Sequence, residues 1–133
     1  MSLTENALEL ARGRHLAMLA TRNPSGTMQV HPLWVSTDGE NILVNTEVHR
    51  RKFKNIEADP SVTVTIMDSD NPWHWSEIRG RVVQTITGPE GRAHIDEMAK
   101  EYMGVDEYPN PIRSERVMLV IEAEHVFDFP PSG

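Results

Sequence analysis

A run of three basic residues, Arg50-Arg51-Lys52, stands where the sequence predicts the start of a short helix. Val48, Phe53 and Ile56 share one face at helical spacing, and Asp59-Pro60 ends the element. Cations in a first turn are unfavourable by roughly a few tenths to 1 kcal/mol each, because the helix dipole is positive at that end. The run therefore requires either full exposure to solvent or a nearby anion.

Lys52 is the unusual member of the run. On a helical wheel of about 100° per residue it falls on the apolar face beside Val48, whereas Arg50 points to the polar face. A buried lysine is unfavourable unless its stem reaches outward or an anion meets it. A phosphate would accept hydrogen bonds from the free backbone N–H groups, the Thr46 hydroxyl and two or three cations. The alternative is a solvated basic turn balanced by the neighbouring glutamates.

Composition restricts the classes of protein and partner. A chain of 133 residues with 38% hydrophobic and 25% charged residues fits one globular domain over residues 1–133. A net charge of -7 argues against nucleic acid, which requires a clustered cationic surface. No apolar run approaches the ~20 residues of a membrane span, and the N-terminal segment lacks the pattern of a signal peptide. The absence of cysteine excludes disulfides and suits a reducing compartment, so we expect a cytoplasmic protein.

The elements that position the basic run alternate between strands and helices. A first helix is predicted from a Ser2/Glu5 capping box to about Gly13, and a third from Thr87-Gly88-Pro89-Glu90 to about Tyr102. Apolar alternation and turn signals predict strands over 15–21, 28–36, 41–46, 62–66, 73–86 (centred on Gly80) and 116–127. These elements indicate a mainly β protein of the α+β class, a six-stranded antiparallel barrel with flanking helices.

The predicted second strand contains a proline. Pro32 removes a donor from the hydrogen-bond ladder, so it belongs at an edge, at a bulge or where a ligand approaches. Along this strand Met28, Val30, Pro32 and Trp34 alternate with Gln29, His31 and Leu33.

The segment NTEVHRRKFKNIEADP, with a strand before it and VTVTI after it, resembles the cofactor-phosphate segment of the pyridoxamine 5'-phosphate oxidase-like superfamily. There a Thr-x-x-x-x-Arg-Lys pattern follows the third strand, and Thr46, Arg51 and Lys52 match it. Arg50 and Lys52 also match the Arg-x-Lys spacing of related deazaflavin-dependent reductases. The order of the LAMLAT strand, the Asp-Gly hairpin, the Trp-rich segment and the RVMLVI strand extends the resemblance over nearly the whole chain. It implies a split β-barrel of the FMN-binding type.

The C-terminal sequence indicates which members of the superfamily the chain resembles most. True pyridoxamine phosphate oxidases are longer and carry a Trp and Arg-Leu motif for the substrate phosphate, whereas this sequence ends EAEHVFDFPPSG. The short form is similar to small reductases that depend on coenzyme F-420. That similarity implies a homodimer with the cofactor at the subunit interface, its phosphate at the second helix and its ring beside the second strand. By position Gln29, Val30, His31 and Pro32 would line the ring, and Trp75 would reach it from the partner subunit.

The resemblance implies hydride transfer from reduced F-420 to a small-molecule electrophile, because such chemistry belongs to the cofactor. No catalytic residue is assigned, and the proton could come from solvent or from His31. Two other functions stay open: an FMN-dependent oxidoreductase of the same fold, and a non-catalytic protein that binds or carries F-420. The tryptophans could equally serve core or interface packing, and His31 could simply face water. The histidines lack metal-ligand spacing, so we expect no metal.

Overall fold

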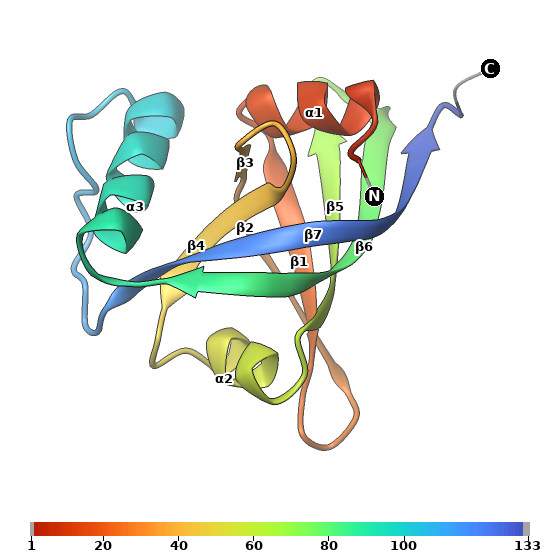
Figure 1. Cartoon of the computed structure of the whole chain (residues 1–133). Helices are drawn as coiled ribbons and strands as arrows, with labels where there is room; N and C mark the ends of the chain where they lie inside the picture. Colours follow the sequence, from red (N-terminus) through yellow and green to blue (C-terminus); the bar gives the residue numbers. More distant parts are fainter. Residues whose placement is uncertain (1, 132–133) are drawn as a thin grey trace.

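A strongly curved antiparallel sheet forms the body of the protein, and three helices pack around it (Figure 1). The computed structural model describes residues 2–131. In that range the elements are α1 (Glu5–Arg12), β1 (Leu16–Arg22), β2 (Met28–Trp34), β3 (Ser36–Thr37), β4 (Ile42–Glu47), α2 (Arg51–Ala58), β5 (Ser61–Asp68), β6 (Asn71–Ile86), α3 (Gly88–Met103) and β7 (Arg116–Phe129). The strand order in the sheet is β2-β1-β5-β6-β7-β4-β3. The predicted α+β, mainly β class is confirmed.

Residues 2–131 contain seven strands rather than the predicted six, because the predicted second strand breaks at Val35. The Val35 N–H donates to the Tyr102 hydroxyl at 3.1 Å, and that hydroxyl lies 2.9 Å from the Val35 carbonyl oxygen. The backbone groups of Val35 therefore bond to a side chain of α3 instead of a neighbouring strand. Before the break β2 pairs with β1, and after it β3 pairs with β4 at the opposite edge of the sheet.

The helix ends follow local chemistry. The predicted Ser2/Glu5 capping box is wrong, because the N-cap of α1 is Thr4, whose hydroxyl accepts the Ala7 N–H at 3.1 Å. The same hydroxyl donates to Asp128, which ties the cap to β7. Helix α3 ends before Gly104, as the sequence predicted, and Gly104 adopts the left-handed conformation. Helix α2 begins only at Arg51, so Val48 and Arg50, which the sequence predicted to lie in the helix, are in the turn before it.

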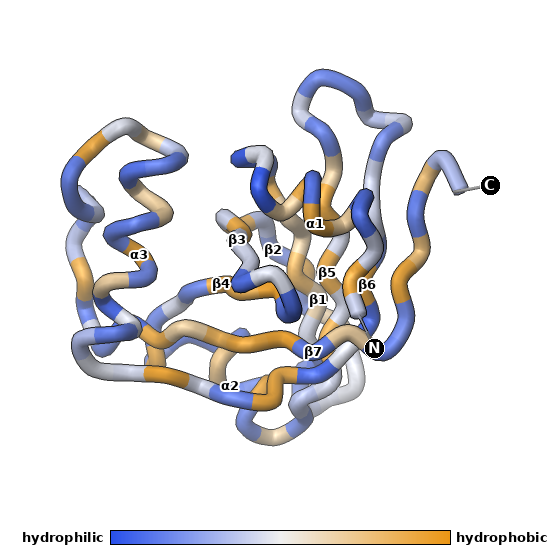
Figure 2. Tube along the Cα trace, turned by 45° about the horizontal axis from the view of Figure 1, so that its top comes forward, coloured by the Kyte–Doolittle hydropathy of each residue, from blue (hydrophilic) through white to orange (hydrophobic). Residues whose placement is uncertain are grey.

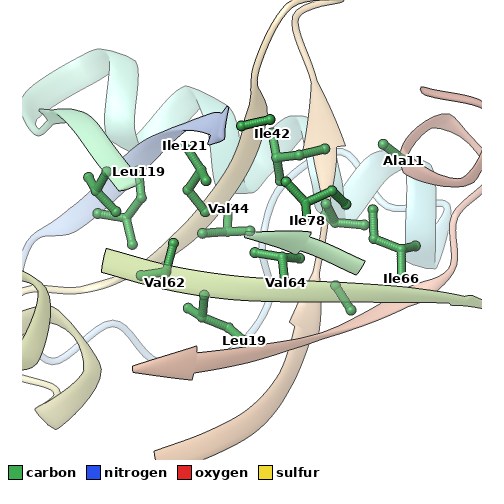
Figure 3. Packing of buried hydrophobic residues seen from close by; sticks show 14 of the residues in the cluster. Ala11, Leu19, Ile42, Val44, Val62, Val64, Ile66, Ile78, Leu119 and Ile121 are labelled. Atoms are coloured by element: carbon green, nitrogen blue, oxygen red, sulfur yellow. The ribbon is translucent and has the colours of Figure 1, made fainter. Parts of the chain in front are cut away.

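Branched side chains from facing parts of the curved sheet fill its interior (Figure 3). Val44, Val64, Ile78 and Leu119 are fully buried there, and α1 adds Leu10. Figure 2 shows the matching hydrophobic middle of β7. In the range 2–131 no helix is long and apolar enough to cross a membrane.

The proline-containing strand β2 is an edge strand, paired only with β1, so an edge position, one of the three that the sequence predicted for Pro32, is the one that the structure has. On the other side β2 lies near β4 without a ladder between them. This unpaired seam between β2 and β4 is where the barrel stays open, and the basic run lies at one end of it.

Candidate functional site

A cavity of about 310 Å³ lies at the seam between β2 and β4. We call it the seam cavity. Its apolar and aromatic lining comes from Leu16, Pro32, Leu33, Trp34, Ile95, Met98 and Tyr108. Its polar lining comes from Asn45, Thr46, Arg50, Lys52, Asn110 and Arg116. One wall can therefore pack against a ring while the other presents cations and hydrogen-bond donors.

Lys52 points inward, as the helical wheel predicted, and is only 9% exposed. Its polar contact is a 3.5 Å approach of Nζ to His31 Nδ1, and no carboxylate within residues 2–131 forms an ion pair with it. Burial, followed by the charges of Arg50 and Arg116, lowers the pKa of Lys52. An anion in the cavity would reverse this penalty, because it would give the ammonium the counter-charge that the protein does not supply.

Arg116 is a second buried cation of the cavity, 7% exposed, and the sequence analysis missed it. Its Nε–H donates to Asn45 Oδ1 at 2.8 Å, and its guanidinium lies over the Tyr108 ring, 5.1 Å from the centroid. It enters the site because β7 pairs with β4 and sets Arg116 directly opposite Glu47. In the sequence, the only indication of this role was a charged residue at the start of an apolar strand.

Glu47 organises the rim of the cavity and is 1% exposed. Its Oε1 accepts the backbone N–H groups of Arg113 and Ser114 at 2.6 and 2.9 Å, and its Oε2 accepts from Arg50 at 3.2 Å. Burial raises the pKa of Glu47, but these hydrogen bonds and the charge of Arg116 outweigh it and lower the pKa. Glu47 is therefore ionised, and one carboxylate stands among the three cations Arg50, Lys52 and Arg116. The cluster keeps an excess of positive charge.

The other predicted site residues are distributed unevenly. Thr46 and Pro32 line the cavity with Arg50 and Lys52, and His31 touches Lys52. Outside the lining are Arg51, which is exposed at the start of α2, and Gln29 and Val30 farther along β2. Their contact with a cofactor stays a prediction.

The aromatic residues divide between the cavity and the outer face of the sheet. Trp34 lines the cavity and stacks on Tyr102 at 5.1 Å. Trp75 lies elsewhere, stacked on Phe129 at 5.6 Å, and Trp73 is 72% exposed. Within one subunit Trp75 cannot line the seam cavity, so its predicted role depends on a partner subunit.

His94 of α3 lies directly behind Asn45 and is 6% exposed. Burial, followed by the charge of Arg116, lowers the pKa of His94 to about 4. The imidazole is therefore neutral near pH 7. In the part of the chain that the structure describes, no group of three His, Asp or Glu side chains is arranged to hold a metal ion.

Comparisons with known proteins agree on the fold. The family described as pyridoxamine 5'-phosphate oxidase matches residues 3–129. An F420 reductase structure is 30% identical, with a TM-score of 0.83, over 94% of this chain and 98% of that chain. A conserved hypothetical protein from Mycobacterium tuberculosis is 21% identical, with a TM-score of 0.73, over 96% and 84% of the two chains. A heme storage protein from Vibrio cholerae is 14% identical, with a TM-score of 0.66, over 99% and 98%. No curated protein matches the chain.

Proposed function

Since the chain belongs to the pyridoxamine 5'-phosphate oxidase-like superfamily of split barrels, we propose that it is an oxidoreductase whose seam cavity binds the phosphate of coenzyme F-420. The observation that carries this proposal is Lys52, a lysine only 9% exposed that has no carboxylate partner in residues 2–131 and lies beside Arg50 and Arg116. Phosphate has the charge and the acceptor oxygens that this cluster lacks. The choice of a deazaflavin over FMN rests on the 30% identity to an F420 reductase.

Each lining residue has a definite task in this proposal. Lys52 and Arg116 would bind phosphate oxygens from the buried side and Arg50 from the rim, and the Thr46 hydroxyl would donate a further hydrogen bond. Pro32 and Trp34 would provide the apolar wall that excludes water. When bound, the reduced deazaflavin would supply the hydride for a small-molecule electrophile. The chain's own contribution is orientation, electrostatics and exclusion of water.

The ring of the cofactor is proposed to lie along β2, beside Gln29, Val30, His31 and Pro32. As an edge strand paired only with β1, β2 leaves the backbone groups of its other side free to meet a planar ligand. Arg51, at the exposed start of α2, is proposed to reach the same phosphate from outside the cavity.

A homodimer would complete the site. Large apolar side chains stay exposed on the outer face of the sheet, contributed by β1, β2, β5 and β7: Leu16, Met18, Met28, Val30, Met67, Phe127 and Phe129. Met18 is paired with Pro32 of β2, and Met67 is paired with Trp75. The apolar face is therefore adjacent both to β2 and to Trp75. An isologous dimer across this face would cover the apolar surface and bring Trp75 toward the partner's β2.

Met18→Glu tests the dimer. A carboxylate at the middle of the apolar face should convert the protein from a dimer to a monomer of 15.1 kDa, because an unpaired charge would be buried at the interface. Sedimentation velocity gives the readout, and Ser25→Glu in the exposed β1–β2 turn is the control that should stay dimeric. A monomeric wild-type protein would contradict both the dimer and the contact of Trp75 with the cofactor.

Lys52→Met tests the phosphate site. It should weaken F-420 binding by roughly 10- to 100-fold, the range expected for one lost hydrogen bond to a charged group. Lys54→Met is the matched control, since Lys54 is exposed on the same helix. Fluorescence titration would follow F-420 and the same deazaflavin without its phosphate, whose binding should be insensitive to Lys52→Met. Equal affinity of both variants for F-420 would overturn the phosphate site.

The choice of cofactor has its own experiment. Parallel titrations of the wild-type protein with F-420, FMN and heme should show the tightest binding for F-420. A yellow protein that prefers FMN would replace the deazaflavin by a flavin and leave the phosphate site in place. Tight F-420 binding without turnover on a broad panel of electrophiles would instead indicate a binding or carrier protein.

A further inference from the structure

Four polar side chains form a continuous hydrogen-bonded row that begins in the lining of the seam cavity and runs away from it. Arg116 Nε–H donates to Asn45 Oδ1 at 2.8 Å, and Asn45 Nδ2 lies 3.1 Å from His94 Nδ1. His94 Nε2 lies 2.8 Å from Ser36 Oγ, at the lining of a second cavity of about 440 Å³ between α1, β3 and α3. Asn45, His94 and Arg116 are each more than nine-tenths buried. Arg116 is thus held at the seam cavity by a row of hydrogen bonds to other side chains of the protein.

The direction of every bond in this row is fixed. An arginine Nε–H can only donate, so the Asn45 atom that faces it must be the carbonyl oxygen. The Asn45 amide nitrogen then faces two acceptors, the Gly91 carbonyl oxygen at 3.0 Å and His94 Nδ1. His94 must therefore carry its proton on Nε2 and donate to Ser36. Reversing the Asn45 amide would place its N–H₂ against the Arg116 donor.

The guanidinium makes no direct hydrogen bond to a carboxylate within residues 2–131. Its hydrogen-bond acceptor at Nε is the neutral amide of Asn45. The carboxylate oxygen in an ion pair with it, Glu47 Oε2, is 3.7 Å from Arg116 Nη1, beyond hydrogen-bond length, and already accepts from Arg50. Tyr108 covers one face of the guanidinium plane. Its remaining N–H groups have no hydrogen-bond partner within residues 2–131, so they are available to an anion in the seam cavity.

From this arrangement we infer that Asn45 and His94 are positioning residues for anion binding: they fix the guanidinium of Arg116 toward the seam cavity and leave its remaining N–H groups free for the ligand. The inference rests on the proposed phosphate site and explains how its most buried arginine is held. Asn45 supplies the acceptor, and His94 prevents the Asn45 amide from rotating. A neutral His94 adds no second cation that would need its own counter-ion.

Asn45→Asp is the decisive variant, because it keeps the shape of the side chain and changes its charge. The carboxylate would neutralise Arg116, so the affinity for inorganic phosphate and for F-420 should fall by roughly tenfold or more. Binding of the deazaflavin that lacks phosphate should stay unchanged. The carboxylate would also face His94 Nδ1 and favour a proton there. Imidazole ¹⁵N resonances should therefore show a proton on Nε2 alone in the wild-type protein and a proton on Nδ1 in Asn45→Asp.

A second pair of variants keeps the inference testable if Asn45→Asp does not fold. His94→Asn retains an acceptor where Nδ1 lies and should keep near wild-type phosphate affinity, whereas His94→Leu removes the acceptor and should lose several-fold. In the wild-type protein, phosphate titration should shift the Arg116 Nε–H resonance. Equal phosphate affinity across all these variants would overturn the inference.

The outcomes separate this inference from the proposed function. Phosphate binding that weakens in Asn45→Asp and His94→Leu, in a protein that does not bind F-420, would refute the cofactor and support the role of Asn45 and His94. Wild-type protein that binds F-420 with an affinity insensitive to Asn45→Asp and His94→Leu would support the cofactor and refute that role. Protein that binds neither phosphate nor F-420 would refute both.

Discussion

Gly80→Ala is expected to unfold the protein or to lower its free energy of unfolding by more than about 4 kcal/mol, the range of the most damaging single substitutions. Gly80 of β6 lies opposite a bulge in β7, where the pairing shifts between Arg79 and Gly80 and leaves Glu124 of β7 without a partner residue in β6. A Cβ on Gly80 would collide with the carbonyl oxygen of Glu122 and approach its carbonyl carbon to 3.0 Å. These are backbone atoms of a central strand, so the clash cannot be relieved by a side-chain rotation.

Gly26→Ala is the matched control for this prediction. Gly26 has a φ of +92°, but no atom lies within 4 Å of the place that an alanine methyl group would occupy, so alanine there should lose only about 1–2 kcal/mol of backbone energy. Urea denaturation monitored by circular dichroism would compare the two variants with the wild-type protein. Equal stability of the two variants would show that β6 and β7 do not approach each other this closely at Gly80. Because β7 carries Arg116, this approach also fixes one wall of the seam cavity.

Acidification from pH 7 to pH 4 is expected to remove roughly 3 kcal/mol of stability through His94 alone. The pKa of His94 falls from 6.5 to about 4 on folding, so between these values the unfolded chain binds a proton that the folded protein does not. Falling pH therefore favours the unfolded state across this window, and roughly 2 of the 3 kcal/mol should be lost by pH 5. Glu47, whose pKa is lowered, loses its contribution only below its ordinary value of 4.5.

Urea midpoints between pH 7 and pH 5 would measure this loss. His94→Asn removes the titrating group and should flatten the curve over that range, whatever its stability at pH 7. His125→Asn, on the exposed face of β7, should keep the wild-type pH dependence. Parallel curves for the wild-type protein and His94→Asn would show that His94 is not held neutral, and would remove one support for its role beside Asn45.

Stability and ligand binding are linked at the seam cavity. The buried cations Lys52 and Arg116 both line the seam cavity. Burial of these two charges destabilises the folded protein when no anion is bound. A bound phosphate should therefore raise the free energy of unfolding, since it binds only the folded state. Substitutions at the seam cavity are expected to change stability and cofactor binding together. A substitution at Gly80 should act mainly on stability.

Features that depend on neighbours along the chain could be predicted from the sequence alone. Helical periodicity placed Lys52 on the inner face of α2, and turn residues ended α2 and α3 where the structure has them. A proline within a strand predicted an edge, a bulge or a ligand contact for Pro32, and the structure has the edge. These predictions succeeded because side-chain direction in a helix or strand repeats with a fixed local period.

Which distant residues share the site depended on strand pairing and helix packing. Arg116 meets Glu47 because β7 pairs with β4, and Asn45 meets His94 because α3 packs behind β4. The strand break at Val35 likewise depends on the Tyr102 hydroxyl of α3. Contacts between residues 46 to 71 positions apart have no local period, so no pattern in the sequence could reveal them. The basic run was visible in the sequence, but the second buried cation and the residues that hold it were set by the tertiary fold.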